Sequence, residues 1–571
     1  MEPRRIILAV VLMAAVLIVA PILFPTPVPA PGSVPVATDS VRTDSTGLTT
    51  GSAAAAASAA PVAGSVTGPV PTMGAAADAA AAPVVLVPVD TTLVKTTPAE
   101  FRTTNRGAAL IGASMTHYPA LSNKGRTRQG TVELAAPGDR LLGFRIVMPG
   151  DTIDLSRTVF RTTQEEENGR TVVRYDAELG MASRTARIRY SFLPDSYRVD
   201  VSAAIAGVPD NSYLLIDLPP GFRSAEADTS EDQSHLAYAY KPELSSAEGV
   251  AFRSLDPGER EIQAGPITWA VAKNKYFLLG VLAPKGQAGF AEVGVTGGER
   301  VAKEATRGQA TLVAPLKGGN VAFEVYAGPQ EFKRLVAMGR EFETSNPYGG
   351  WLQGIVQPFA TMVIRLLLWM KSTLGLSYGW ILVIFGVAVR IILWPLNQKA
   401  MRSSMAMQRI QPELQEIQAK YKGDPQKLQA AMMQVYKEHG MSPFSSLSGC
   451  LPMMIPLPVF FALFFVFQNT IEFRGVSFLW FPDISLKDPF YVIPILVAIT
   501  AMGLSWLGMR GIKANEQQKM MMYLMPAMMM VIFFNMASGL NLYYFVQNLA
   551  SLPQQWLISQ ERSKKVPLVK G

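Results

Sequence analysis

The sequence predicts a multi-domain protein, in which an α-helical polytopic membrane domain of six spans, one of them an N-terminal anchor, accompanies a large all-β antiparallel sandwich. Apolar residues make up 49% of the 571 positions and charged residues only 17%. Long apolar runs occur at the start and in the last third of the chain, as in membrane spans. Between them, short stretches alternate apolar and polar residues, as half-buried strands do. One cysteine and three histidines exclude a disulfide scaffold and a zinc ribbon.

The first segment, 1–24, is predicted to be a transmembrane anchor. Its apolar run follows Arg4 and Arg5, which favour a cytoplasmic start, and it is long enough to cross a bilayer. A cleaved signal peptide is the alternative, but such peptides have an apolar part of about 7–15 residues, and the candidate cleavage site at Ala30 precedes a proline. Residues 25–82 are rich in Pro, Ala and Ser, so we expect an extended linker outside the cytoplasm.

Residues 83–345 are predicted to form the β-sandwich. Apolar residues fall on even positions in Arg187–Phe192 and on odd positions in Tyr197–Ile205, on either side of Pro194, which predicts a hairpin with one buried face. Similar runs occur at Thr171–Leu179, Tyr276–Leu282, Ala310–Ala314 and Val321–Tyr326. The acidic run Glu165–Glu167 is expected to be a solvated loop. No nucleophile elbow, phosphate-binding glycine loop or metal-ligand spacing occurs here, so we expect no enzyme activity and no metal.

After Gly349 the strand pattern stops. Residues 350–376 are interrupted by Gln357, Arg365 and Lys371, which predicts an amphipathic helix at the outer membrane interface. Five spans are predicted within 377–561: Tyr378–Leu396, Leu451–Asn469, Phe490–Met509, Met520–Ala537 and Leu540–Ser559.

Loop charges predict the orientation of these spans. Lys and Arg are concentrated in Asn397–Met441, in Arg510–Lys519 and in the basic tail 562–571, whereas Thr470–Pro489 has more acidic than basic residues. Cytoplasmic loops carry the excess of Lys and Arg. The sequence therefore predicts cytoplasmic N- and C-termini and a β domain on the opposite side of the membrane.

The segment 397–441 is predicted to form a cytoplasmic helical hairpin. Apolar residues recur at helical intervals on both sides of Gly423, which is followed by an N-cap aspartate and a proline at the first helical position. Its defining side chains are Met401, Met405, Ile410, Pro412, Asp424 and Pro425. Pro412 is expected to bend or interrupt the first helix. An ordinary solvated loop is the alternative, but capping and periodicity agree on the hairpin.

Arg390 lies inside a predicted span, where an arginine costs about 2.5–3.5 kcal/mol on insertion scales. Its long side chain reaches toward the cytoplasmic headgroups, or it lines a hydrated cavity open to the cytoplasm. No acid lies within the predicted spans to pair with it, which favours the cavity. Polar residues of other spans line such a cavity or form interhelical hydrogen bonds: Gln468, Asn469, Ser505, Asn535, Asn541, Gln547 and Asn548.

Several motifs in this half resemble the YidC family of membrane protein insertases, which includes the mitochondrial Oxa and chloroplast Albino proteins. They are Val389–Leu396, Gln411-Pro412, Cys450–Pro452, Pro458–Phe460, Gln517–Met521, Met525-Pro526, and Ser538–Tyr544 with Asn548. The order of anchor, linker, β domain and five spans looks like the Gram-negative long form. Thr104–Ala108 and Lys275–Phe277 in the β domain are also similar to the family.

The resemblance implies an insertase and chaperone for nascent membrane proteins, without a cofactor, in the bacterial inner membrane with a periplasmic β domain. The family's groove arginine falls on Arg390, and the tyrosines that meet incoming segments fall on Tyr543 and Tyr544. With the polar residues of neighbouring spans, the candidate groove is Arg390, Ser505, Asn535, Tyr543, Tyr544, Gln547 and Asn548. The implied partners are nascent membrane proteins, the Sec translocon, the ribosome, signal-recognition targeting factors and membrane lipids.

The chain departs from the family pattern in two places. The segment Ser442–Cys450 is longer and poorer in glycine, and Pro456 replaces an expected glutamine, so Pro456 is left out of the site. A polytopic solute or anion transporter is one rival function, but the sequence has no paired broken helices in corresponding halves. A membrane-anchored envelope-polymer-binding protein or enzyme is another, and the β region offers it no catalytic constellation.

Overall fold

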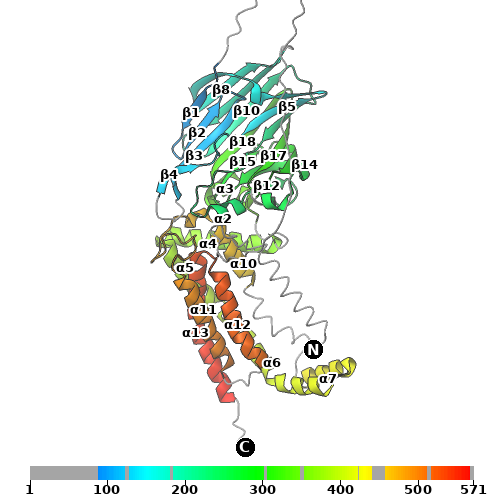
Figure 1. Cartoon of the computed structure of the whole chain (residues 1–571), viewed down its shortest axis with the longest axis vertical. Coiled ribbons are helices and arrows are strands. Elements are labelled where there is room, and N and C mark those ends of the chain that lie inside the picture. The colour runs from blue at the N-terminus through cyan, green and yellow to red at the C-terminus, as the bar shows by residue number, and fades with distance from the viewer. Residues whose placement is uncertain are drawn as a thin grey trace, which may run out of the picture. The chain divides into compact units, whose positions relative to one another are not determined.

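The computed structural model describes residues 88–121, 128–180, 184–300, 305–347, 353–421, 423–439, 457–510 and 516–565 (Figure 1). The predicted anchor (1–24), linker (25–82) and segment Ser442–Cys450, with Pro456, lie outside these residues.

The β domain contains two antiparallel sheets, drawn blue to green in Figure 1. The smaller sheet has four strands in chain order: β1 (Thr91–Lys95), β2 (Ala99–Thr104), β3 (Ala109–Leu121) and β4 (Arg128–Glu133). The larger sheet has 14 strands, and its main path runs β6-β5-β11-β17-β16-β14-β15-β18-β10-β9-β8-β7. The two remaining strands, β12 and β13, pair with each other and β12 also pairs with β14.

The strands of the larger sheet have the following bounds: β5 (Gly143–Met148), β6 (Asp151–Asp154), β7 (Arg161–Glu167), β8 (Arg170–Glu178), β9 (Thr185–Phe192), β10 (Arg198–Ala206), β11 (Tyr213–Asp217), β12 (Ala237–Pro242), β13 (Glu248–Ala251), β14 (Arg260–Lys273), β15 (Phe277–Leu282), β16 (Phe290–Gly297), β17 (Gly308–Pro315) and β18 (Asn320–Pro329). Short helices accompany them, including α2 (Thr229–Ser234) and α3 (Phe332–Met338).

The predicted hairpin is confirmed as β9 and β10. Val199 pairs with Phe192 and Val201 with Tyr190, so the apolar positions of both strands share one face. These side chains are at most 2% exposed. Alternation with a period of two therefore located both the strands and their buried face.

The two sheets pack through aromatic side chains. Phe101 of β2 lies 5.3 Å from Phe192 of β9, measured between ring centroids. The hydroxyl of Tyr175 donates to Thr103 Oγ1 at 2.6 Å, and that of Tyr190 donates to the carbonyl oxygen of Ala108 at 2.7 Å. Both of these hydroxyls thus have a partner on or directly beside the smaller sheet, as buried polar groups usually do. The predicted large antiparallel β domain is confirmed.

The expected loop at Glu165–Glu167 is wrong, because these residues belong to β7, an edge strand paired only with β8 in the described sheet. The side chains are mostly exposed, and Glu167 pairs with Arg174 on the neighbouring β8 and with Arg189 on β9, the next strand beyond it. Charged side chains on an edge strand discourage pairing with another chain. The run of like charges suggested a loop, but in the sheet its charge is balanced by arginines of β8 and β9, so the segment forms a strand.

The helical region contains α4 (Gln353–Leu374), α5 (Tyr378–Ile392), α6 (Trp394–Lys420), α7 (Pro425–Glu438), α10 (Leu457–Asn469), α11 (Val492–Met509), α12 (Glu516–Phe533) and α13 (Ser538–Lys565). Among described residues, α11 is by itself long and apolar enough to cross a membrane. The pair Val356–Leu374 and Tyr378–Ile392 passes the same test together but is bent by 117°. Six spans are therefore not confirmed. Because of the polar residues at the start of α12 and along α13, neither helix has an apolar stretch long enough to pass this test for a membrane span.

The segment predicted as a hairpin forms α6 and α7. The Asp424 side chain accepts a hydrogen bond from the Lys427 backbone at 3.1 Å, as an N-cap does. The two helices pack through a small buried cluster: Ile410, Leu414, Val435 and Tyr436. Met401 is half-buried, and the side chains of Met405, Pro412 and Pro425 lie outside the described ones.

Pro412 does not interrupt the first helix, since α6 continues through it to Lys420. The expected interruption is therefore wrong, and the expected bend at Pro412 stays a prediction. A proline removes one backbone hydrogen bond, and the remaining bonds of a long helix are enough to keep it continuous.

The loop between α10 and α11 is held by two buried aspartates. Asp483 accepts hydrogen bonds from the backbone of Gly475 and Ser485, both at 2.8 Å. Asp488 accepts from the Trp480 indole at 3.2 Å and from the Ile493 backbone at 2.8 Å, at the start of α11. Because these carboxylates satisfy the loop's backbone, the loop has one folded shape rather than many.

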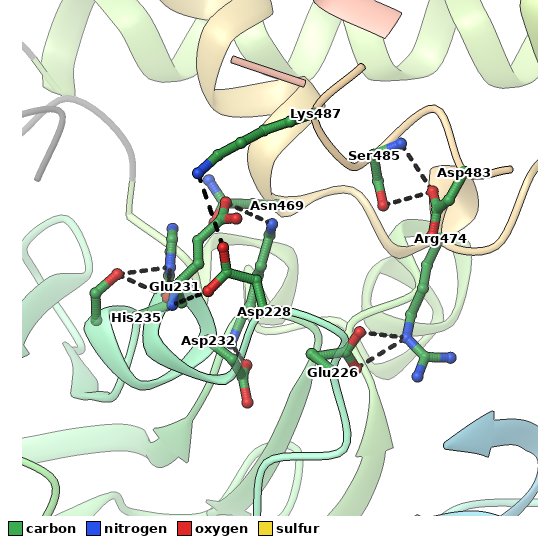
Figure 2. Close-up of polar contacts among 12 residues, drawn as sticks. Glu226, Asp228, Glu231, Asp232, His235, Asn469, Arg474, Asp483, Ser485 and Lys487 are labelled. Atoms are coloured by element: carbon green, nitrogen blue, oxygen red, sulfur yellow. Dashed lines mark hydrogen bonds and ion pairs between the residues drawn. The ribbon is translucent and has the colours of Figure 1, made fainter. Parts of the chain in front are cut away.

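This loop contacts the β domain, as Figure 2 shows. Arg474 pairs with Glu226 at 2.9 Å, and both side chains are almost fully buried. Lys487 approaches Asp228 to 3.8 Å in a more exposed position. The backbone of Phe332, at the start of α3, donates to Glu472 Oε1 at 3.2 Å. The β domain and the loop that joins two of the predicted spans therefore share a buried polar interface.

Candidate functional site

Arg390 opens onto a hollow of about 440 Å³ between α5 and α13. The hollow is otherwise lined by apolar side chains, among them Val383, Val387, Trp394, Val546 and Leu549. A cationic group in an otherwise apolar hollow must be hydrated or bound by a polar group. The geometry thus places the predicted groove arginine at a cavity between two helices.

One side of the Arg390 guanidinium is held by Gln554. Nη2 donates to Gln554 Oε1 at 2.7 Å, and Gln554 Nε2 donates to the carbonyl oxygen of Trp394 at 3.0 Å. Gln554 is only 1% exposed. Arg390 Nε is buried and has no hydrogen-bond partner among the described residues. The guanidinium is therefore positioned on one side and keeps donors for water or an incoming acceptor.

Gln554 was not among the predicted groove residues. On α13 it follows Tyr543 and Gln547 at spacings of 11 and 7 residues, which put all three on one helix face. That stripe of polar groups in the last predicted span was the signal available in the sequence.

Tyr543 and Gln547 fasten α13 to α5. Gln547 Nε2 donates to the carbonyl oxygen of Gly386 at 3.0 Å and to the Tyr543 hydroxyl at 2.9 Å. The Tyr543 ring lies 5.7 Å from that of Phe385 and is 3% exposed. These two residues thus lie on the Arg390 side of α13, where they join the helices.

The other predicted groove residues face different neighbours. Tyr544 packs against Phe460 at 5.5 Å and Phe533 at 5.2 Å. Asn548 donates to the Val497 carbonyl oxygen at 3.2 Å and to Thr500 Oγ1 at 3.1 Å, so it joins α13 to α11.

Ser505 is half-buried on α11, and Asn535 is exposed just after α12. Neither lines the hollow around Arg390. The hollow lies where α13 meets α5, whereas α11 packs on a different face of α13. A role for Ser505 and Asn535 in a groove therefore stays a prediction.

Metal binding has no support in the part of the chain that the structure describes. No group of three or more His, Cys, Asp or Glu side chains there is placed to hold a metal ion. The chemistry that the hollow offers is charge and hydrogen bonding by Arg390, beside an apolar surface.

Comparison with known proteins covers both halves of the chain. Residues 87–362 match the YidC periplasmic domain family, and residues 369–565 match the 60Kd inner membrane protein family. A membrane protein insertase YidC from Chlorobium phaeovibrioides is 32% identical over 473 residues, which cover 77% of this chain and 76% of the relative. The chain belongs to the YidC family of membrane protein insertases. This membership confirms the insertase assignment that the motifs predicted.

Other family members are similar over much of their length. The YidC of Chlorobaculum tepidum is 30% identical over 431 residues, covering 71% of both chains. A crystal structure of an active YidC insertase is 18% identical, covering 82% of this chain and 92% of that one with a TM-score of 0.33. The YidC family assignment rests on the sequence matches.

Proposed function

We propose that this chain inserts nascent membrane proteins into the inner membrane and assists their folding, and that the hollow at Arg390 receives the polar part of an incoming segment. The supporting observation is the Arg390 guanidinium itself. It is anchored by Gln554, opens onto a cavity between α5 and α13, and forms no ion pair within the described ranges.

The proposed mechanism is physical. A short acidic or polar stretch of the client enters the hollow, where the positive charge of Arg390 lowers the free energy of crossing. The apolar wall formed by Val383, Val546 and Leu549 contacts the apolar part of the client, which then moves into lipid. No covalent step is needed.

The proposed topology has six spans, cytoplasmic termini and a periplasmic β domain. Helix α4 supports an interfacial position, because its exposed face carries Phe359, Met362, Leu366 and Trp369. Its opposite face, which includes Val363 and Leu367, is buried against other helices. An exposed apolar stripe on an amphipathic helix is suited to the boundary between lipid headgroups and acyl chains. Membrane lipids are the partner proposed for this face.

The hairpin α6 and α7 and the basic tail 562–571 are proposed to meet the ribosome and signal-recognition targeting factors. The Sec translocon is a further proposed partner. The support is the capped, packed hairpin, which presents a preformed surface, and the positive charge of the segments predicted to be cytoplasmic.

Insertion by the purified full chain in proteoliposomes tests the proposal. The client is a single-span protein with a short acidic external segment, and protease protection measures its insertion. Insertion should depend on the chain and fall when Arg390 is replaced by Ala. Equal protection in empty liposomes, or full activity of the variant, would overturn the proposal.

A further inference from the structure

A second basic cavity lies in the β domain. It has a volume of about 400 Å³, and its charged lining consists of Arg102, Glu133, Asp139, Arg140, Arg106 and Arg223. The side chains come from β2, the turn after it, the end of β4, the loop that follows, and the segment after β11. Four arginines thus converge from segments far apart in the chain.

The two acids of this cavity already have cationic partners. Glu133 pairs with Arg102 at 2.6 Å and accepts the Ala113 backbone N–H at 3.1 Å. Asp139 accepts both ends of the Arg307 guanidinium, at 3.0 and 2.7 Å. Arg140 donates to the Ser156 carbonyl oxygen at 3.3 Å. Within the described ranges, this leaves the guanidinium groups of Arg106, Arg140 and Arg223 without an ion pair, although Arg140 is near enough to Asp154 to interact with its charge.

The turn that carries Arg106 is tightly built. Gly107 and Ala108 both have positive φ, +82° and +49°, which is costly for the alanine. A Cβ on Gly107 would lie 3.1 Å from the Leu155 carbonyl oxygen and 3.4 Å from Arg140 Nη1. Buried Asn105 holds the turn by accepting the Asp90 N–H at 2.8 Å and donating to the Pro88 carbonyl oxygen at 2.7 Å. Packing on all sides thus fixes a turn whose arginine side chain is exposed at the cavity.

We propose that this cavity binds carboxylate side chains of an acidic polypeptide segment. Unpaired guanidinium groups are suited to bidentate recognition of carboxylates, and Ile111 and Ala135 add an apolar wall for the intervening residues. The cavity has room for a short stretch of extended chain.

The location of the cavity favours a client segment as its occupant. Arg223 lies three residues before Glu226, whose partner Arg474 is on the loop between α10 and α11. The same loop contacts Pro119 on β3, and seven residues away on that strand Gly112 pairs with Arg102 of the cavity. An acidic segment delivered to that side of the membrane would therefore reach the cavity along β3. This inference rests on the proposed function, since the insertase must deliver the segment.

Binding to the full chain in nanodiscs of zwitterionic lipid tests the site. The probe is a fluorescent peptide of about ten residues alternating Asp or Glu with Ala, compared by anisotropy with its Asn and Gln counterpart. We expect the acidic peptide to bind at least about tenfold more tightly at about 0.05 M salt, and its affinity to fall at about 0.3 M salt. Replacing Arg106 and Arg223 together with Ala should weaken binding about tenfold, whereas Arg106→Lys should lose less.

The matched control replaces Arg161 and Arg260 with Ala, which removes the same charge from exposed positions outside the cavity. Equal weakening in the control would overturn the site and leave only general charge attraction. Inorganic phosphate or phosphatidylglycerol vesicles are added as competitors. If they displace the peptide when the concentration of phosphate groups is below that of the peptide carboxylates, the cavity is assigned to phosphate groups instead. Insertion measured on the same preparation separates the two hypotheses: normal insertion without peptide binding overturns only this one, and absent insertion overturns the proposed function.

Discussion

Arg474 Nε lies 2.9 Å from both carboxylate oxygens of Glu226, and the two side chains are only 3% and 6% exposed. The same guanidinium donates to the Pro119 carbonyl oxygen at 2.9 Å and lies 5.7 Å from the centre of the Phe277 ring. One side chain of the loop between two predicted spans thus contacts three separate segments of the β domain. Figure 2 shows its pair with Glu226. Burial raises the pKa of Glu226, although the charge of Arg474 opposes this shift.

Replacing Glu226 with Gln should loosen this interface. The change leaves the buried Arg474 charge without its ion-pair partner, and breaking a buried pair in this way costs about 3 kcal/mol or more. Hydrogen exchange of backbone amides in 470–491 should therefore become about 100-fold faster. Asp228→Asn is the matched control, because its pair with Lys487 is half-exposed at 3.8 Å, and such pairs contribute at most about 1 kcal/mol. Similar exchange in both variants would contradict a stabilising role for the Arg474 pair.

Glu472 should make the same interface sensitive to pH. Burial raises the pKa of this carboxyl from 4.5 to about 7, and nearby Glu331 adds to the shift while the backbone N–H groups and Lys333 oppose it. The packed state therefore binds more protons than the exposed state between about pH 4.5 and about pH 7. Packing is strongest below this window, weakens as the pH rises through it, and is constant above it.

Limited proteolysis of the full chain near α3 at about pH 5 and about pH 8 measures this effect, because opening should be easier at the higher pH. Glu472→Gln keeps a neutral side chain of the same shape, so its opening should be low and equal at both values. A wild-type pH dependence that persists in the variant would assign the effect to another group.

Arg390→Ala should impair insertion of clients with acidic external segments, and Arg390→Lys should largely retain it, because the requirement is a positive charge in the hollow. Gln554→Leu should give an intermediate defect, since the charge stays but loses its positioning contact at 2.7 Å. Insertion rates in proteoliposomes measure all three variants. Clients without acidic external residues serve as the control, and an equal loss for them would indicate damage to the helix packing.

Replacing Asp424 and Pro425 with Gly should fray the start of α7, because it removes the N-cap contact to Lys427 and loosens the chain. We expect slower insertion and less crosslinking to ribosomes or targeting factors. Protease resistance of the membrane helices should be unchanged, because α7 packs mainly on α6. Unchanged insertion would show that the hairpin is dispensable, and lost resistance would show that it is structural.

Deleting residues 100–300 should leave insertion of simple clients nearly intact. Among the described residues, the hollow at Arg390 is lined by α5, α13 and Trp394 of α6. Without the β domain, Arg474 becomes hydrated rather than buried, so its charge carries no desolvation cost. Abolished insertion at a normal level of the membrane half would show that the β domain takes part directly.

Local patterns in the sequence were sufficient for several elements. Period-two alternation located β9, β10 and their buried face, and the Gly423-Asp424-Pro425 signal located the start of α7. Arg390 was recognisable because a charge in an apolar run has to be hydrated or paired. These features depend on neighbours within a few residues, and the motifs around Arg390 were enough to indicate the insertase family.

The tertiary structure decided which distant groups meet. Arg390 and Gln554 are 164 residues apart, and Arg474 and Glu226 are 248 apart, so no local periodicity relates either pair. Glu165–Glu167 illustrates the same limit, because the arginines that balance this acidic edge strand come from β8 and β9. Hydrophobic patterning specifies which face of an element is buried. The partner of a buried charge depends on how those faces pack, and that is determined only when the whole chain folds.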